Sequence, residues 1–146
     1  MKVLISTCLL GVACKYSGSD NARPALVAAL QAAGHELVPV CPEVYGGLPT
    51  PRTPAERIGS RVVTAAGADV TAQYRKGAEI ALQLARLTGC RVAVLKASSP
   101  SCGHGTIYDG TFSGKKIPGS GVAAELLEQN GIAVYTDEDC AAALPF

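Results

Sequence analysis

The sequence is poor in charge and lacks the basic clusters that charge-driven binding requires. Charged residues make up 17% of the 146 residues, and the formal net charge is +1. The electrostatic field that attracts a protein to polyanionic nucleic acid is therefore missing. We expect no large DNA or RNA partner, whereas a single nucleotide is compatible with this composition.

The sequence also has no apolar run long enough to cross a membrane, no internal repeat and no low-complexity tract. Its opening stretch, KVLISTCLLGVAC, matches a secretion signal only loosely. Gly11 stands three residues before Cys14, where a lipoprotein signal has a bulky aliphatic residue. We expect instead a buried strand at Lys2–Ser6. The protein is then expected to be cytoplasmic, where thiols stay reduced.

Short β-branched runs alternate with helical patterns along the chain. Runs of strand length occur at Val3–Ser6, Glu36–Val40, Arg91–Lys96 and Ile132–Tyr135. Helices are expected at Arg23–Ala33, Thr71–Thr88 and Ser120–Leu127, and in a terminal segment capped by Thr136 and Asp139. A short hairpin around Val62–Val70 and a turn at Asp109 and Gly110 interrupt the alternation. The pattern predicts an α/β fold: a single-domain, Rossmann-like, doubly wound and mostly parallel sheet over residues 1–146, with helices on both faces.

Six cysteines are present, but none belongs to a Cys-x-x-Cys pair, which is the usual spacing of structural zinc sites. In an open parallel sheet, ligands bind beyond the carboxyl ends of the strands. Cys8, Cys41 and Cys102 each follow a predicted strand, so we expect their thiols to meet at one edge. Cys90 precedes its strand and should lie at the opposite edge. Cys140 is expected to be a small buried apolar residue of the terminal helix.

Three converging thiolates favour a soft metal, either an iron–sulfur cluster or zinc. Spacing alone does not separate this interpretation from three ordinary buried cysteines. The iron–sulfur interpretation is the stronger of the two metal alternatives, because a structural zinc site normally has four protein ligands, often in close Cys-x-x-Cys pairs. Three thiolates on one cubane would leave one iron free to act as a Lewis acid. Cys14 lies in the first loop and is ambiguous, since it could be a nearby thiol without being a ligand.

The loops after the second and third strands, CPEVYGGLPTPR and SSPSCGHGTIYDGTFSG, are rich in Gly and Pro. Residues of this kind position backbone, and constrained loops often hold a site. Glu43 is a candidate for proton transfer beside the predicted metal; the alternatives are an exposed charge or an ion pair with Arg52. Ser99 and Ser101 are candidate substrate contacts, or simply turn residues.

Three further signals are weak. The YSGSDN loop at Tyr16–Asn21 is faintly similar to the phosphate loop of ATP pyrophosphatases that modify tRNA. It lacks their paired glycines and does not directly follow a strand, which disfavours tRNA thiolation. His104 is either a ligand or proton carrier or a surface residue, and Asp109 is expected to shape its turn.

Four ordered blocks give the chain a family resemblance: CLLGVACKYSG, CPEVYGGLPTPRTPAE, SPSCGHGTIYDGTFSG and GSGVAAELLEQNGI. Over nearly its whole length the chain resembles the TudS-type bacterial thiouracil desulfurases, also called desulfidases. The resemblance implies a 4Fe-4S cluster held by Cys8, Cys41 and Cys102. It also implies hydrolytic, non-redox desulfuration of a thiolated pyrimidine such as 2-thiouracil, 4-thiouracil or a thio-UMP. The products would be sulfide and uracil or its nucleotide.

The resemblance also suggests residue roles. Glu43 would move the proton, and the catalytic serine would be Ser99, with Ser101 as the second choice. Where relatives carry an Arg and an acidic or amide residue around the first-motif tyrosine, this chain has Lys15, Tyr16 and Ser17.

Lys15, Tyr16 and Arg52 are therefore the candidate substrate contacts. Arg23 and His104 are further candidates for holding a phosphate, and the choice between free base and nucleotide stays open. The alternative function is a non-catalytic zinc or iron–sulfur binding or sensing module.

Overall fold

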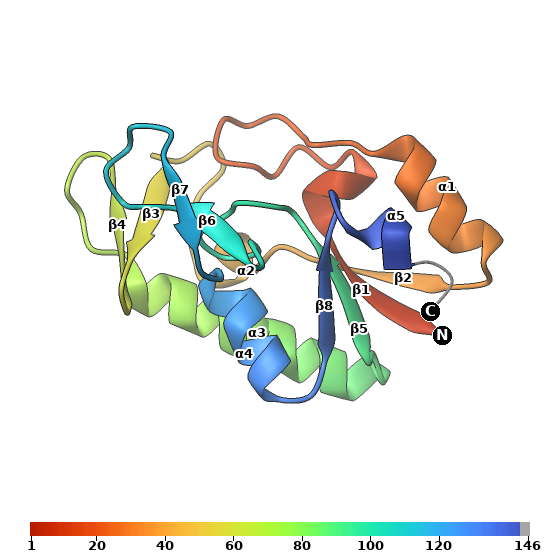
Figure 1. Ribbon diagram of the computed structural model, residues 1–146. Coiled ribbons are helices and arrows are strands. Elements are labelled where there is room, and N and C mark those ends of the chain that lie inside the picture. The colour runs from red at the N-terminus through yellow and green to blue at the C-terminus, as the bar shows by residue number, and fades with distance from the viewer. Residues whose placement is uncertain (144–146) are drawn as a thin grey trace.

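A four-stranded parallel sheet forms the centre of the computed structural model, which describes residues 1–143 (Figure 1). Its strands are β1 (Lys2–Ser6), β2 (Glu36–Val40), β5 (Val92–Leu95) and β8 (Ala133–Thr136), in the order β2-β1-β5-β8. All three pairings are parallel, so the predicted α/β fold class and each of the four predicted strands are confirmed. The opening apolar stretch supplies β1, which lies between β2 and β5. The strand order therefore reverses between β1 and β5.

The helices alternate with these strands, mostly as the sequence predicts. They are α1 (Pro24–Ala32), α2 (Pro42–Tyr45), α3 (Thr71–Thr88), α4 (Val122–Gln129), α5 (Cys140–Ala143) and a 3-10 turn, η1 (Thr7–Leu10). The N-cap of α4 is Gly121 rather than Ser120. The predicted capping box is present: Asp139 N–H donates to Thr136 Oγ at 3.3 Å, and Thr136 N–H donates to Asp139 Oδ1 at 2.7 Å.

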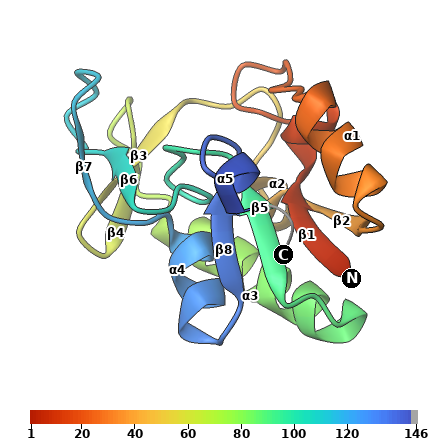
Figure 2. The same cartoon turned by 45° about the vertical axis from the view of Figure 1, so that its right-hand side comes forward.

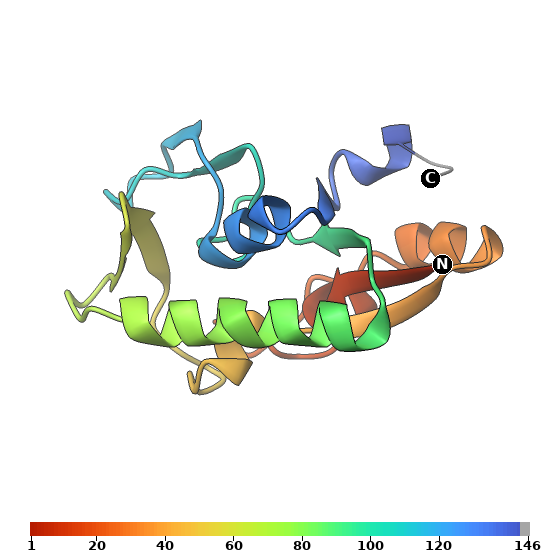
Figure 3. The same cartoon turned by 90° about the horizontal axis from the view of Figure 1, so that it is seen from below.

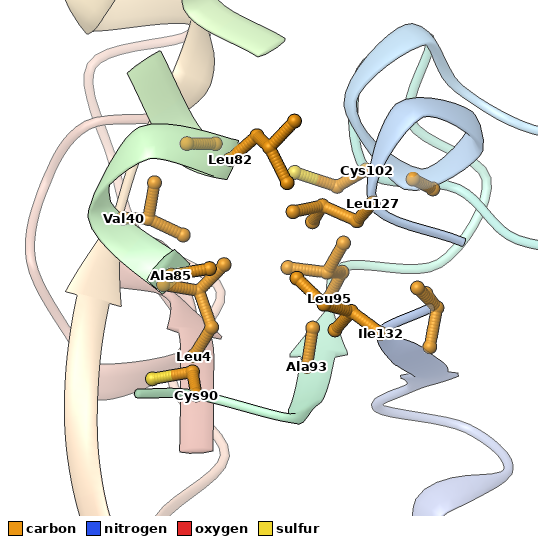
Figure 4. Packing of buried hydrophobic residues seen from close by; sticks show 13 residues of the cluster. Leu4, Val40, Leu82, Ala85, Cys90, Ala93, Leu95, Cys102, Leu127 and Ile132 are labelled. Atoms are coloured by element: carbon orange, nitrogen blue, oxygen red, sulfur yellow. The ribbon is translucent and has the colours of Figure 1, made fainter. Parts of the chain in front are cut away.

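The alternation of side chains along the strands divides the core into two layers, one on each face of the sheet. Leu4 and Leu95 pack with side chains of α3 and α4 (Figure 4). Val3 and Ile5 pack on the other face with side chains of α1 and with Cys140 of α5. Helices thus cover both faces, and α3 runs along one of them (Figure 3). This arrangement confirms the doubly wound prediction.

Two antiparallel hairpins lie side by side at one end of the molecule (Figure 2). They are formed by β3 (Ala55–Ile58) with β4 (Arg61–Thr64), and by β6 (Thr106–Tyr108) with β7 (Lys116–Pro118). The hairpin predicted around Val62–Val70 is misplaced, because the main partner of β4 is β3; the segment after β4 forms a single bridge, Val63 with Asp69. The two-residue turn Gly59-Ser60, which connects β3 to β4, is the sequence feature that indicates the correct hairpin.

The predicted turn at Asp109 connects β6 to β7. Asp109 Oδ1 accepts hydrogen bonds from Thr111 N–H at 2.9 Å and from Thr111 Oγ1 at 2.6 Å, as an Asx turn does. Among residues 1–143, no helix combines the length and apolarity that a membrane span needs. The last three residues of the predicted domain, 144–146, lie outside the described part of the chain.

Candidate metal and catalytic site

A pocket of about 240 Å³ opens at the carboxyl edge of the parallel sheet. Its walls come from the segments that follow β1, β2 and β5, together with the first loop and the start of β3. This is the place where the strand order reverses, and where open α/β sheets bind their ligands. Its lining side chains include four thiols: Cys8, Cys14, Cys41 and Cys102.

The three predicted ligand cysteines reach this pocket from three strand ends. Cys8 lies in η1 directly after β1, Cys41 is the N-cap of α2 directly after β2, and Cys102 lies in the turn after β5. Burial raises the pKa of Cys8, a hydrogen bond from Asn21 lowers it, and Cys41 raises it further. Burial also raises the pKa of Cys102, as do Glu43, Cys8 and Cys41. The three thiols are therefore close enough to interact electrostatically.

Cys14 is a fourth thiol in the same pocket, and sequence reasoning left it ambiguous. It is 8% exposed, and the Cys41 thiol lies 4.0 Å from its carbonyl oxygen. Burial, followed by interactions with Cys41 and Cys8, raises the pKa of Cys14 to about 12. The fold thus brings the first loop against the ligand cysteines.

The donor set fits an iron–sulfur cluster. Thiols are soft ligands, suited to iron–sulfur clusters or to zinc. Cys8, Cys41 and Cys102 line one pocket from three different strand ends, so they can contact a bound group from three sides. Within the described residues, no group of three or more His, Cys, Asp or Glu side chains is arranged to hold a single metal ion.

Two glycine contacts seat α2, and with it Cys41, on α3. A Cβ atom on Gly77 of α3 would lie 1.8 Å from the carbonyl oxygen of Pro42. A Cβ atom on Gly46, at the end of α2, would lie 2.0 Å from the carbonyl oxygen of Gln73. Only glycine allows the two backbones to approach this closely. The position of Cys41 therefore depends on residues without side chains.

The turn that carries Cys102 is held by hydrogen bonds at both of its ends. Ser99 Oγ accepts from Ser101 N–H at 3.1 Å and from Cys102 N–H at 3.0 Å. The Ser101 carbonyl accepts from Ala123 N–H at 2.9 Å, which satisfies one of the free donors at the start of α4. Gly121 allows this contact, because its Cβ would lie 2.3 Å from the Ser101 carbonyl carbon.

Glu43 lies in this pocket as a paired carboxylate. Its Oε2 atom accepts from Arg52 Nε at 3.3 Å and from Tyr74 Oη at 2.9 Å, and Arg52 Nη2 lies 3.2 Å away. The Glu43 and Arg52 side chains are only 16% and 6% exposed. Burial and the Glu43 carboxylate raise the pKa of Tyr74, which keeps its hydroxyl a donor. The other carboxylate oxygen, Oε1, has no partner within residues 1–143 and is available to a ligand.

The predicted substrate contacts differ in whether their side-chain donors are already hydrogen-bonded within the protein. Lys15, Tyr16 and Arg52 all line the pocket. Arg52, however, also donates through Nη1 to the Cys14 carbonyl at 3.0 Å, to the Pro49 carbonyl and to the Thr50 hydroxyl. Its guanidinium therefore already connects Glu43 of α2 to the first loop and to the segment at residues 49–50.

The two predicted serines are also separated by the structure. Ser99 lines the pocket, whereas Ser101 is fully buried outside the lining, and its hydroxyl has no hydrogen-bond partner in the described chain. The two weaker phosphate candidates lie outside the lining as well. Arg23 is paired with Asp137 at 2.8 Å, and His104 contacts Glu128.

Several lining residues were missed in the sequence. Lys96 directly follows β5, so the strand-end rule that selected the cysteines would have found it. Asn21 ends the YSGSDN loop, whose faint similarity to a phosphate loop gives no indication of a contact with a cysteine. Tyr74 carried no signal, because its helical spacing indicates only a core position.

The remaining cysteines lie where the strand order predicts. Cys90 and Cys102 lie at opposite ends of one core layer (Figure 4). Cys140 is fully buried on the other face of the sheet. Neither residue belongs to the pocket lining. Substitutions of Cys90 and Cys140 are therefore suitable controls for substitutions of the pocket cysteines.

Comparisons with known proteins show the family to which the chain belongs. A family model described as 2-thiouracil desulfurase matches residues 3–139. The chain is 44% identical over 147 residues to the uncharacterized protein YbbK of Bacillus subtilis (strain 168), covering 94% of this chain and 96% of that protein. It is 46% identical to the solved structure of the [4Fe-4S]-dependent thiouracil desulfidase TudS, with a TM-score of 0.90, covering 98% of this chain and 97% of that one.

Proposed function

We propose that this chain, which belongs to the 2-thiouracil desulfurase family, removes sulfur from a thiolated pyrimidine with the help of a 4Fe-4S cluster. The observation that carries the proposal is the convergence of Cys8, Cys41 and Cys102 on one pocket beside the paired carboxylate of Glu43. The similar TudS structure is named a [4Fe-4S]-dependent thiouracil desulfidase, which supports both the cofactor and the substrate class. The protein is then an enzyme of C–S bond cleavage.

Cys8, Cys41 and Cys102 would hold the cluster, since they follow neighbouring parallel strands and interact with one another. Cys14 would be a neighbouring thiol and not a ligand, because the segment after β1 already supplies Cys8 to the cluster. When bound, a cluster with three protein ligands supplies one iron that can act as a soft Lewis acid toward a thiocarbonyl sulfur. The overall reaction needs no oxidant or reductant: the thiopyrimidine and water give the oxo-pyrimidine and hydrogen sulfide.

The side chains supply the proton transfers and the orientation. Water that adds to the ring carbon must lose its protons, and sulfide must gain them. Glu43 Oε1 is the carboxylate oxygen available for this transfer, because Oε2 is occupied by Arg52 and Tyr74. Ser99 Oγ already accepts two backbone N–H groups, which leaves its hydroxyl hydrogen to donate to the substrate. This occupancy favours Ser99 over the buried Ser101 as the catalytic serine.

Lys15 and Tyr16 are the proposed substrate contacts at the pocket wall. Tyr16 is 48% exposed, and Lys15 Nζ lies 5.8 Å from the centre of its ring. An aromatic ring with one open face can stack on a pyrimidine. Arg52 would act on the substrate through Glu43, since its own donors are already paired.

The test is anaerobic cluster reconstitution followed by incubation with 2-thiouracil, 4-thiouracil and 4-thio-UMP. Sulfide and the oxo product are measured against bound iron. We expect Cys8→Ser, Cys41→Ser and Cys102→Ser each to lose iron and activity, because a hydroxyl is a poor ligand for soft iron. Cys90→Ser and Cys140→Ser are the matched thiol controls outside the pocket and should keep both. Cys14→Ser, inside the pocket, tests whether Cys14 is a ligand and should keep its iron.

Two outcomes would overturn the proposal. A colourless protein that binds zinc and leaves all three thiopyrimidines intact would instead support a non-catalytic binding module. Loss of iron in Cys14→Ser, with iron retained in one of the three strand-end variants, would show that a different set of thiols holds the metal.

A further inference from the structure

The last residue of the YSGSDN loop (Tyr16–Asn21), Asn21, contacts Cys8. The loop is closed by its own backbone: Gly18 N–H donates to the Lys15 carbonyl at 2.9 Å, and Lys15 N–H donates to the Ser19 carbonyl at 3.2 Å. Asn21 N–H then donates to the Cys8 carbonyl at 3.0 Å. The loop is therefore anchored at the first predicted cluster ligand.

The Asn21 side chain makes a second contact with the same cysteine. Its amide nitrogen, Nδ2, lies 3.4 Å from Cys8 Sγ. Lys15 Nζ lies 3.4 Å from the amide oxygen, Oδ1. An ammonium group can only donate, so it must face the oxygen, and the amide N–H groups are left for the sulfur. Lys15 thus determines which end of the amide meets Cys8.

We propose that Asn21 is a positioning residue of the cluster, whose amide N–H orients the Cys8 sulfur and sets the cluster's reduction potential. This inference rests on the function proposed above. Groups that hydrogen-bond to metal ligands fix ligand orientation, and hydrogen bonds to cluster sulfurs are one of the factors that set the potential. A donor stabilises the more negative, reduced cluster and so raises its potential.

The surroundings of the contact agree with this role. Cys8 is only 9% exposed, and Asn21 lines the same pocket. Little water therefore reaches the sulfur, and the amide N–H group is a donor already placed beside it.

The experiment compares the reconstituted holoproteins of the wild type, Asn21→Leu and Asn21→Gln by redox titration and by iron loss to a chelator. Asn21→Leu removes the donor and should shift the midpoint potential downward and speed iron loss roughly tenfold. Asn21→Gln keeps an amide and should recover part of both effects. Ser17→Ala is the matched control, because its hydroxyl is exposed and contacts Ser19 of the same loop, and it should match the wild type.

The outcomes separate this inference from the proposed function. A wild-type protein that takes up no cluster refutes the proposed function itself. A wild type that carries the cluster, with Asn21→Leu showing the same potential and the same iron loss, overturns only the role of Asn21. The backbone bond from residue 21 to Cys8 survives substitution, and melting curves check folding. Should Asn21→Leu fail to fold, Asn21→Asp keeps the shape and replaces the donor with a carboxylate, so its potential must fall below that of the wild type.

Discussion

Adding one methyl group at Gly77 should disturb the metal site from the far side of α2. The new Cβ would lie 1.8 Å from the Pro42 carbonyl oxygen and 2.6 Å from the carbonyl carbon, whereas real Cβ contacts essentially never fall below 3.0 Å. The helices must therefore separate by about 1.2 Å at this point. Pro42 stands between Cys41 and Glu43, so a shift of α2 moves a cluster ligand and the proposed proton carrier together.

The magnitude follows from two opposing effects. Replacing Gly by Ala inside a helix gains up to about 1 kcal/mol of helix stability. Overpacking a close contact costs about 1–3 kcal/mol, and the upper value applies here because a backbone carbonyl cannot rotate away. The second close contact, at Gly46, prevents α2 from sliding along α3. The net loss is about 2 kcal/mol, which for a chain of this length lowers the melting temperature by about 4–8 °C.

The assay measures melting temperature, iron content and thiouracil conversion in Gly77→Ala and in Lys76→Ala. Lys76 is the exposed neighbour on the same helix, so its variant reports any general effect on α3. A misplacement of about 1 Å costs roughly 10²-fold in rate, and we expect that loss only in Gly77→Ala. A Gly77→Ala protein that melts at or above the wild-type temperature with full iron content would refute this account of how α2 is seated.

Three further predictions concern the charges and thiols of the pocket. Glu43→Gln should keep its iron but lose roughly 10²- to 10⁴-fold in turnover, measured as product formed per bound cluster; normal turnover would remove Glu43 from proton transfer. Arg52→Ala removes the counter-charge of the largely buried Glu43 carboxylate, to which Tyr74 still donates, and should cost about 3 kcal/mol in denaturant unfolding; a loss below about 1 kcal/mol would contradict the pairing. The metal-free protein should lose stability as pH rises from 9 toward 12. Unfolded thiols ionise near 9.0, whereas the pKa of Cys14 is about 12 and that of Cys102 is also raised. Urea unfolding at pH 8 and pH 10.5 tests the sign.

The central sheet was predictable because the hydrophobic signal there is local. Each of the four parallel strands is a short apolar run. The direction of the strand then fixes the edge of the sheet at which the residues just beyond it lie, such as Cys8 and Cys41. The hairpin partner of β4 was not predictable in the same way. The AERI segment of β3 has two adjacent polar residues, Glu56 and Arg57, and is only partly buried, so it lacks the alternation that indicates a strand.

The residues that line the site were easier to predict from the sequence than the residues that hydrogen-bond to them or pack against them. Glu43 was selected because it lies two residues from Cys41, but Tyr74, which shares its oxygen, comes from a helix 31 residues away. No local pattern encodes such a contact. The approach of α2 to α3 depends on Gly77, and a glycine inside a helical pattern reads only as a weak helix former until the neighbouring backbone is known.

The electrostatics of the pocket link metal loading to proton release. Arg52 is already paired with Glu43, so the thiols meet few cations, and burial keeps Cys8 and Cys102 protonated in the metal-free chain. Lys96 lowers the pKa of Cys8, but burial outweighs it. Iron must therefore replace the protons on these sulfurs, and the positive charge of the metal then balances the thiolates that the protein alone does not. A pocket built in this way holds its ligands as neutral thiols until the cluster arrives, and cluster binding must become tighter as pH rises toward the thiol pKa values.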